Sequence, residues 1–126
     1  MIYLLKEDVS YFAGLFDGEG YVEYCQRYVH KKGKPRPYWY YYIRLEVNMA
    51  DKDMIEWIYN TFKVGSVSKR KNYNDLSKKQ QYRWVCSFQK AYHVAKEILP
   101  YSKVKRTKLQ KIVDHYEKVR KNVLRN

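Results

Sequence analysis

Glu19 is the residue of this sequence best placed to do metal-dependent chemistry, because it follows an expected helix and stands between Gly18 and Gly20. Gly14 and Gly18 are four positions apart and therefore share one face of that helix. Small residues at this spacing let two helices approach closely, so a twofold axis along this face would bring two copies of Glu19 together. Two neighbouring carboxylates repel each other unless a cation lies between them, and hard divalent cations prefer such ligands. The spacing predicts a shared divalent metal, Mg²⁺ or Mn²⁺, that could activate water for attack on a phosphodiester.

The elements that must position Glu19 follow from hydrophobic periodicity and from the glycines and prolines. Apolar residues at helical spacing predict the first helix, which we expect Gly18 and Gly20 to end by adopting the left-handed conformation. Asp51 is the expected N-cap of a second helix. The expected elements are helices at 8–17, 51–62, 90–99 and 104–119, strands at 21–30, 38–48, 66–71 and 81–88, a basic loop at 31–37 and a polar loop at 72–79.

This order of elements predicts an α+β fold over residues 1–126, a single domain in which a four-stranded antiparallel sheet carries helices on one face. In the second strand Ile43, Leu45 and Val47 share one side, while the alternate positions are Tyr, Arg and Glu. Such a strand is buried on one side and polar on the other. We therefore expect the sheet to leave a polar face free for a ligand, and the last few residues of the chain to fray.

The charge of the chain indicates a polyanionic partner. Lys and Arg total 26 against 13 acidic residues, a formal net charge of +13, and nucleic acid is the commonest partner of such a protein. The chain also contains 15 tyrosines, whose rings can stack and whose hydroxyl groups can contact phosphates. Membrane-surface binding is less expected, because the basic residues are spread along the chain instead of lying on one amphipathic helix.

Several other classes of protein are disfavoured. No apolar run approaches the roughly 20 residues of a membrane span, and Met1–Leu5 is too short for a signal peptide, so an intracellular protein of a phage, a bacterium or an organelle is expected. Cys25 and Cys86 are far apart and lack the spacing of a zinc site or the context of a disulfide. The three histidines lack the local spacing of an HNH nuclease.

The segment Phe12–Gly20, FAGLFDGEG, closely resembles the nine-residue signature of the LAGLIDADG homing endonucleases. Ala13, Gly14, Leu15, Asp17 and Gly20 match it letter for letter, and the expected elements follow the αββαββα order of the family over roughly 10–119. The resemblance implies a saddle-shaped sheet and a metal-dependent enzyme that cuts double-stranded DNA. One motif in a chain of this length resembles the homodimeric branch, whose subunits pair through the first helix; the positions implied for that interface are Ala13, Gly14, Asp17 and Gly18.

The resemblance also assigns roles to individual residues. Glu19 matches the metal-binding acidic residue and the carbonyl of Gly18 a backbone ligand, whereas Asp17 matches a position that supports the helix end. Lys105 matches the basic residue near the scissile phosphate, where a cation would stabilise developing charge. The family's water-orienting polar residue corresponds to Asn48 with a shift of one position, or to Met49 in a strict alignment.

In this family the sheet lies in the major groove, where base edges are distinguishable. Period-two alternation then nominates the side chains that read the bases. The predicted readers are Tyr21, Glu23, Cys25, Arg27, Tyr40, Tyr42, Arg44, Glu46, Ser68, Arg70 and Arg83. The basic loop from Lys31 to Arg36 is expected to hold backbone phosphates.

The main alternative is a nucleic-acid-binding protein that does not cleave, such as an intron maturase, which would bind RNA, or a transcription regulator on the same scaffold. Glu19 and Lys105 favour the nuclease. Met49 in the water-orienting position would favour the alternative.

Overall fold

The computed structural model describes residues 3–125 except Lys31, Lys34 and 71–78, and it describes side chains as far as Val119. The elements are α1 (Lys6–Glu19), β1 (Gly20–Val29), β2 (Tyr38–Met49), α2 (Lys52–Phe62), β3 (Ser66–Arg70), β4 (Gln81–Ser87), α3 (Phe88–Ile98), the 3₁₀ turn η1 (Leu99–Tyr101) and α4 (Arg106–Arg125). The predicted α+β class and element order are confirmed. Most of the polar loop at 72–79, with Lys31 and Lys34 of the basic loop, lies outside the described residues.

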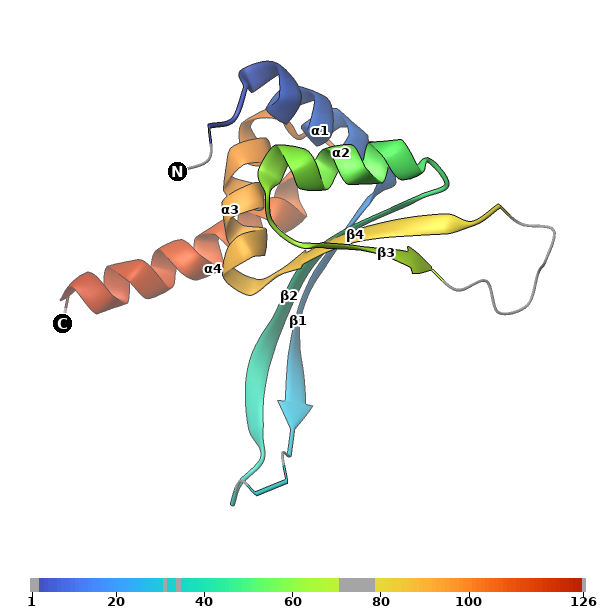
Figure 1. Cartoon of the computed structure of the whole chain (residues 1–126). Helices are drawn as coiled ribbons and strands as arrows, with labels where there is room; N and C mark the ends of the chain where they lie inside the picture. The colour runs from blue at the N-terminus through green and yellow to red at the C-terminus, as the bar shows by residue number, and fades with distance from the viewer. Residues whose placement is uncertain (1–2, 31, 34, 71–78, 126) are drawn as a thin grey trace.

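The sheet has the strand order β1-β2-β4-β3, and every neighbouring pair is antiparallel. β1 and β2 form one long hairpin, β3 and β4 form another, and β2 pairs with β4 in the centre. The two hairpins diverge away from the centre, and α1, α2 and α3 lie together on one side of the sheet (Figure 1). This arrangement leaves the opposite face of the sheet uncovered. No helix within the described part of the chain is long and apolar enough to cross a membrane.

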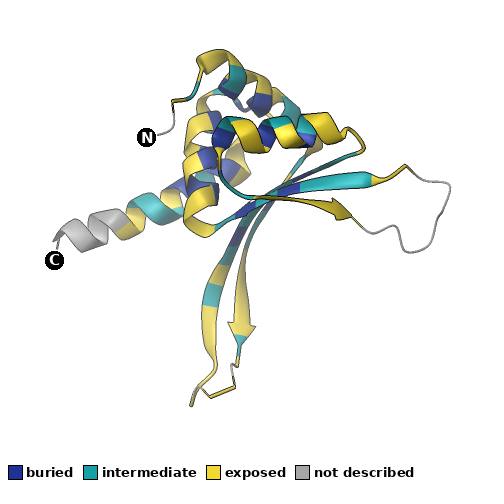
Figure 2. Cartoon of the chain, in the orientation of Figure 1, coloured by how far each residue is buried: buried dark blue, intermediate teal, exposed yellow. Residues whose placement is uncertain are grey.

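The core lies between the sheet and the helices. Phe12 and Phe16 of α1 are fully buried, as are Leu45 and Val47 of β2 and Trp84 of β4. The Trp84 indole also donates a hydrogen bond of 3.0 Å to the carbonyl of Val64, which satisfies its one polar group. Burial is concentrated where the strands run beneath the helices, and the far end of the β1–β2 hairpin is exposed (Figure 2).

The last helix is attached to the first hairpin by aromatic contacts. The hydroxyl of Tyr24 lies 3.2 Å from Nδ1 of His115, and the Tyr41 and His115 rings meet at a centroid distance of 4.6 Å. Burial lowers the pKa of His115, which favours the neutral ring in this contact. Helix α4 continues to Arg125, six residues beyond the end that we expected.

The junction between α1 and β1 differs from the expectation in one respect. Asp51 caps α2 as predicted, by accepting a hydrogen bond of 3.1 Å from the Met54 amide. Gly20, however, is extended, with φ −82° and ψ 158°, so the left-handed ending predicted for α1 is wrong. Its lack of a side chain matters for another reason: a Cβ at Gly20 would lie 2.2 Å from Cδ2 of Phe16. The helix therefore runs directly into the strand, and the Phe16 ring occupies the space that a side chain would need.

Replacing Gly20 with alanine is expected to lower the free energy of unfolding by about 1–3 kcal/mol, the usual cost of overpacking a rigid core. The added methyl group would overlap the fully buried ring of Phe16. Chemical denaturation of G20A measures the loss. Comparing F16L with F16L/G20A tests the cause. Alanine at position 20 should lower the free energy of unfolding less in this background, because the Phe16 ring is gone. An equal cost in both backgrounds would show that the ring is not the reason.

Candidate catalytic site and nucleic-acid interface

Glu19 lies where the helical layer meets the open face of the sheet. It is the last residue of α1, its side chain is exposed, and β1 begins at the next residue. Gly20 pairs with Val47 and Tyr21 with Glu46, so extending this register by one step sets Glu19 across from Asn48. Two of the predicted catalytic residues thus belong to the same corner, at the end of the β1–β2 ladder.

Hydrogen bonds with Asp17 hold Lys105 near the end of α1. One carboxylate oxygen of Asp17 accepts a hydrogen bond of 2.8 Å from the Lys103 amide, and the other accepts one of 3.1 Å from the Lys105 amide. The ammonium group of Lys105 in turn donates to the Asp17 carbonyl at 3.2 Å. These bonds join the end of α1 to the turn before α4, although the two segments are 88 positions apart in sequence. Asp17 therefore supports the helix end, as expected, and also positions Lys105.

The same contacts determine the protonation of Asp17. Partial burial would raise the pKa of its carboxyl group, but the backbone amides of Lys103, Lys105 and Val104, together with the charge of Lys105, outweigh it and lower the pKa. Hydrogen bonds to the charged form favour that form. Asp17 is therefore a carboxylate at neutral pH, and it stabilises the fold in that form.

Asn48 and Met49 lie on opposite sides of β2. Asn48 pairs with Arg83 of β4, and its amide donates a hydrogen bond of 2.8 Å to Glu46 on the uncovered face. Met49 packs against the hydrophobic core on the helix side. Of the two candidates for the water-orienting position, Asn48 is the one whose side chain lies on the open face.

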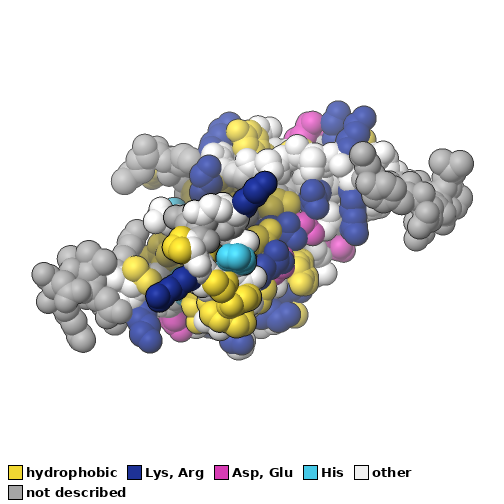
Figure 3. Space-filling model, turned by 90° about the horizontal axis from the view of Figure 1, so that it is seen from below, with side chains coloured by type: hydrophobic (Ala, Val, Ile, Leu, Met, Phe, Trp, Pro, Cys, Tyr) yellow, Lys and Arg dark blue, Asp and Glu magenta, His cyan; other side chains and the backbone are white. Residues whose placement is uncertain are grey.

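The registers place every predicted reader on the face of the sheet opposite the helices. Glu23 pairs with Arg44 and Arg27 with Tyr40, while Ser68 pairs with Arg83 across β3 and β4. The residues at the alternate positions along the strands, such as Val22, Leu45 and Trp84, are buried in the core. Arg83 lies on this face through its pairing with Asn48 of β2 and Ser68 of β3. Viewed from the side away from the helices, the molecule displays many Lys and Arg side chains and few acidic ones (Figure 3).

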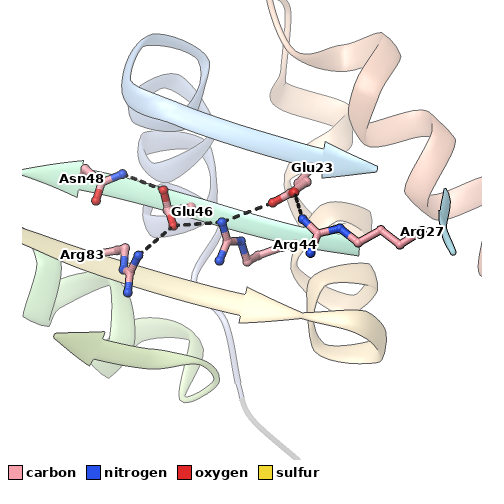
Figure 4. Close-up of polar contacts among 6 residues, drawn as sticks. All are labelled: Glu23, Arg27, Arg44, Glu46, Asn48 and Arg83. Atoms are coloured by element: carbon pink, nitrogen blue, oxygen red, sulfur yellow. Dashed lines mark hydrogen bonds and ion pairs between the residues drawn. The ribbon is translucent and has the colours of Figure 1, made fainter. Parts of the chain in front are cut away.

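Sequence alternation missed a network of ion pairs on this face (Figure 4). Glu23 binds Arg27 at 2.8 Å and Arg44 at 3.2 Å. Glu46 lies 3.5 Å from Arg44 and 3.6 Å from Arg83, and it also accepts the hydrogen bond from Asn48. Arg27 stacks over the ring of Tyr42, with its guanidinium carbon 3.8 Å from the ring centroid. The charged readers Glu23, Arg27, Arg44, Glu46 and Arg83 are therefore held by one another. The cross-strand register was the information needed to find this.

A sequence profile described as LAGLIDADG endonuclease matches residues 12–122, which is most of the chain. The chain belongs to the LAGLIDADG endonuclease family. No curated protein sequence matches it.

Solved homing endonucleases share the fold. I-CvuI, in complex with the I-CreI target, gives a TM-score of 0.67 at 18% identity, covering 83% of this chain and 62% of that one. The archaeal intron-encoded I-Vdi141I, complexed with DNA, gives 0.64 at 12% identity, with 84% and 64% covered. The group I intron-encoded I-CeuI, complexed with DNA, gives 0.66 at 9% identity, with 100% and 61% covered. The chain spans less than two-thirds of the length of each of these proteins.

The LAGLIDADG helix, α1, presents its glycines to the outside. Gly14 and Gly18 are exposed, and a Cβ at either position would meet nothing within 4 Å in the subunit. Ala13, which we expected at a dimer interface, is instead fully buried in the core and has no surface for a partner. The carboxylate of Asp17 is engaged with the turn before α4. The open part of the helix face is therefore defined by its two glycines.

The oxygen donors of the LAGLIDADG motif match a hard divalent cation in kind. Glu19 supplies a carboxylate, and the carbonyl groups at the end of α1 are acceptors that a helix leaves without internal partners. Within the described residues of one subunit, no group of three His, Cys, Asp or Glu side chains is placed to hold a metal ion. Of the acidic side chains in the motif, only that of Glu19 is free of the contacts that engage Asp17.

Replacing Asp17 with asparagine is expected to lower the free energy of unfolding by about 1–2 kcal/mol at neutral pH, a charged hydrogen-bond contribution discounted for partial exposure. Because the folded pKa of Asp17 is lowered, its stabilisation is present above the unfolded pKa and is lost as the pH falls through the folded value. The difference between D17N and the parent protein should therefore shrink in acid.

Denaturation curves from neutral to acidic pH measure this difference. Asp114→Asn is the matched control, since Asp114 is exposed on α4 and accepts its hydrogen bond from Gln110 of the same helix. A D17N effect that stays constant with pH would contradict the assignment.

Proposed function

We propose that this protein is a site-specific DNA endonuclease that acts as a homodimer and hydrolyses both strands of a long, roughly palindromic site with the help of Mg²⁺ or Mn²⁺. Two observations support the proposal: the β1–β2 register, extended by one step, sets Glu19 across from Asn48, and Asp17, two residues before Glu19, holds Lys105. Family membership supplies the reaction class.

The uncovered face is suited to the major groove of a duplex. It carries side chains that suit base edges: Arg pairs with guanine, and Glu accepts from cytosine. The net charge of +13 would draw the protein to the phosphate backbone irrespective of sequence. Base reading by the sheet and phosphate contacts at its margins would together fix the register of the protein on its site.

The proposed reaction needs three roles from the corner residues. Glu19 and the carbonyl of Gly18 would hold the divalent ion, which when bound supplies an activated water and stabilises the leaving oxygen of the phosphodiester. Asn48 would accept a hydrogen bond from the attacking water and so orient it. Lys105 would place its ammonium group where negative charge develops on the phosphate.

A second subunit gives this arrangement its symmetry. Gly14 and Gly18 leave the C-terminal half of one face of α1 without side chains, so two copies of the helix could approach closely there. That approach would set two Glu19 carboxylates beside each other, where a shared cation offsets their repulsion. It would also set one catalytic corner on each strand of a duplex, as a double-strand break requires.

Glu19→Gln is expected to reduce cleavage roughly a hundredfold or more while leaving DNA binding within a few-fold, because it removes the charged oxygen ligand and keeps the shape. A randomised duplex library with Mg²⁺ measures cleavage, and a mobility-shift assay measures binding. Glu7→Gln, at the opposite end of α1, is the matched control and should cut normally. Normal cutting by E19Q would contradict the metal role, and binding without cutting by the parent protein would favour the non-cleaving alternative.

Leucine at Gly14 or Gly18 is expected to convert the dimer into monomers without unfolding the subunit. Each subunit has room for the side chain, whereas a partner helix packed against the glycines does not. Light scattering gives the mass and circular dichroism gives the fold. Thr107→Leu, an exposed position on α4, controls for a surface leucine as such. A folded G14L or G18L protein with the parent's dimeric mass would overturn the pairing through α1.

A further inference from the structure

Glu46 is the centre of the network on the uncovered face (Figure 4). Its side chain is only 13% exposed. One carboxylate oxygen faces Arg44 at 3.5 Å and Arg83 at 3.6 Å, and the other accepts the Asn48 amide hydrogen bond at 2.8 Å. A single acidic residue of β2 thus contacts two arginines from adjacent strands and the asparagine of the catalytic corner.

The network is not optimised for stability. Among the described residues, the buried side-chain atoms without a hydrogen-bond partner are the Nε atoms of Arg44 and Arg83, Oε1 of Glu46, Oδ1 of Asn48 and Oγ of Ser102. All of these except the Ser102 atom belong to the Glu46 cluster. Buried charges that lack full hydrogen bonding contribute little to folding and can oppose it. Their concentration at one place indicates a role in binding or catalysis.

The carboxylate of Glu46 dictates which way the Asn48 amide points. A carboxylate only accepts hydrogen bonds, so Asn48 must present its NH₂ group to Glu46. The amide oxygen of Asn48 is then left as the acceptor. It is buried and has no partner within the described residues, so a water would reach it only when the side chains of the cluster move apart on DNA. An acceptor is what is needed to orient a water through its proton.

Glu46 also restricts the two arginines while leaving each with a donor. It contacts Nη2 of Arg44 and Nη1 of Arg83. Among the described contacts, neither Nη1 of Arg44 nor Nη2 of Arg83 takes part in an ion pair. Each arginine can therefore offer a terminal N–H group to a base edge from a fixed position, and the acceptors of guanine are the usual partners.

We propose that Glu46 is a positioning residue that couples sequence recognition to cleavage: it orients Arg44 and Arg83 toward guanine-containing base pairs and sets the Asn48 amide for the attacking water. This inference rests on the proposed function. It names the bases that the centre of the sheet reads and makes recognition and catalysis depend on the same carboxylate.

Charge gives Glu46 a second, measurable effect. Arg27, Arg44 and Arg83 against Glu23 and Glu46 leave a net charge of +1 on the network, three positive less two negative, and neutralising Glu46 would make it +2. A more positive groove binds any duplex more tightly through the phosphates. Loss of Glu46 should thus strengthen non-specific binding while it weakens discrimination between bases.

The test compares E46Q with the parent protein on the site that the parent selects from a randomised duplex library. For E46Q we expect roughly tenfold weaker discrimination at the guanine positions, tighter binding to unrelated duplex, and a roughly tenfold slower single-turnover rate at saturating protein. Glu56→Gln is the matched control, because it removes the same charge from an exposed pair with Lys52 on α2, across the sheet. E56Q should match the parent in all three measurements.

Two further variants separate geometry from charge and from misfolding. Glu46→Asp keeps the charge but shortens the reach, so it should lose discrimination without gaining non-specific affinity. In an Arg83→Ala background, E46Q should change the base preference less than it does in the parent, because the two residues act together. Thermal melting identifies any variant that fails to fold, and E46D then serves in place of E46Q.

The outcomes distinguish this inference from the proposed function. If the parent protein selects no duplex at all, the proposed function is wrong and the inference is wrong with it. If the parent selects and cuts a site, and folded E46Q and E46D keep the same base preferences and single-turnover rate, the proposed function stands and the role of Glu46 is refuted.

Discussion

The direct junction of α1 with β1 is the constraint on which the rest of the site depends. A helix that passes into a strand without a loop places its last residue at the boundary between the helical layer and the sheet, and here that residue is Glu19. The junction is possible because Gly20 lacks a Cβ, so that the Phe16 ring can fill the space beneath the strand. The same residue starts the ladder with β2, which fixes the position of Asn48. The packing of Phe16 in the core and the position of Glu19 therefore both depend on Gly20.

The remaining part of the corner comes from the distant end of the chain. The Asp17 carboxylate fixes the turn before α4 by accepting hydrogen bonds from its backbone amides. The Lys105 ammonium group adds a hydrogen bond to the Asp17 carbonyl. Backbone donors at a turn would otherwise need water, so Asp17 satisfies the turn and positions the lysine at once. The turn before α4 is rich in hydrogen-bond donors, and the last turn of α1 offers it both a carboxylate and a carbonyl as acceptors. Three segments that are far apart in sequence therefore meet at the end of α1.

Periodicity was sufficient for the elements and for the faces of the strands, because alternation along a strand and the spacing along a helix are local properties. It placed Arg44 and Glu46 on the open face and Leu45 in the core. Helical spacing also put Ala13 on the apolar side of α1 with Phe12 and Phe16, and its burial agrees. Only the family resemblance assigned Ala13 to a dimer interface. Local patterns gave Gly20 the wrong role, because the position of the Phe16 ring, four residues earlier, is set by its burial in the core. The ion pairs required the register between strands, which no single segment contains.

On the proposed function, the two signs of charge on the uncovered face would explain how a strongly basic protein can be selective. A face of cations alone would bind every duplex through its phosphates, and the net charge of +13 already provides that attraction. Selectivity requires that a wrong sequence be penalised as well as that the right one be bound. Carboxylates between the arginines would supply that penalty, because Glu23 and Glu46 repel phosphate and compete for the guanidinium groups unless a base offers a well-placed acceptor. The cost appears as unpaired polar atoms in the free protein, and on the proposed function a matching duplex would be the partner that compensates for it.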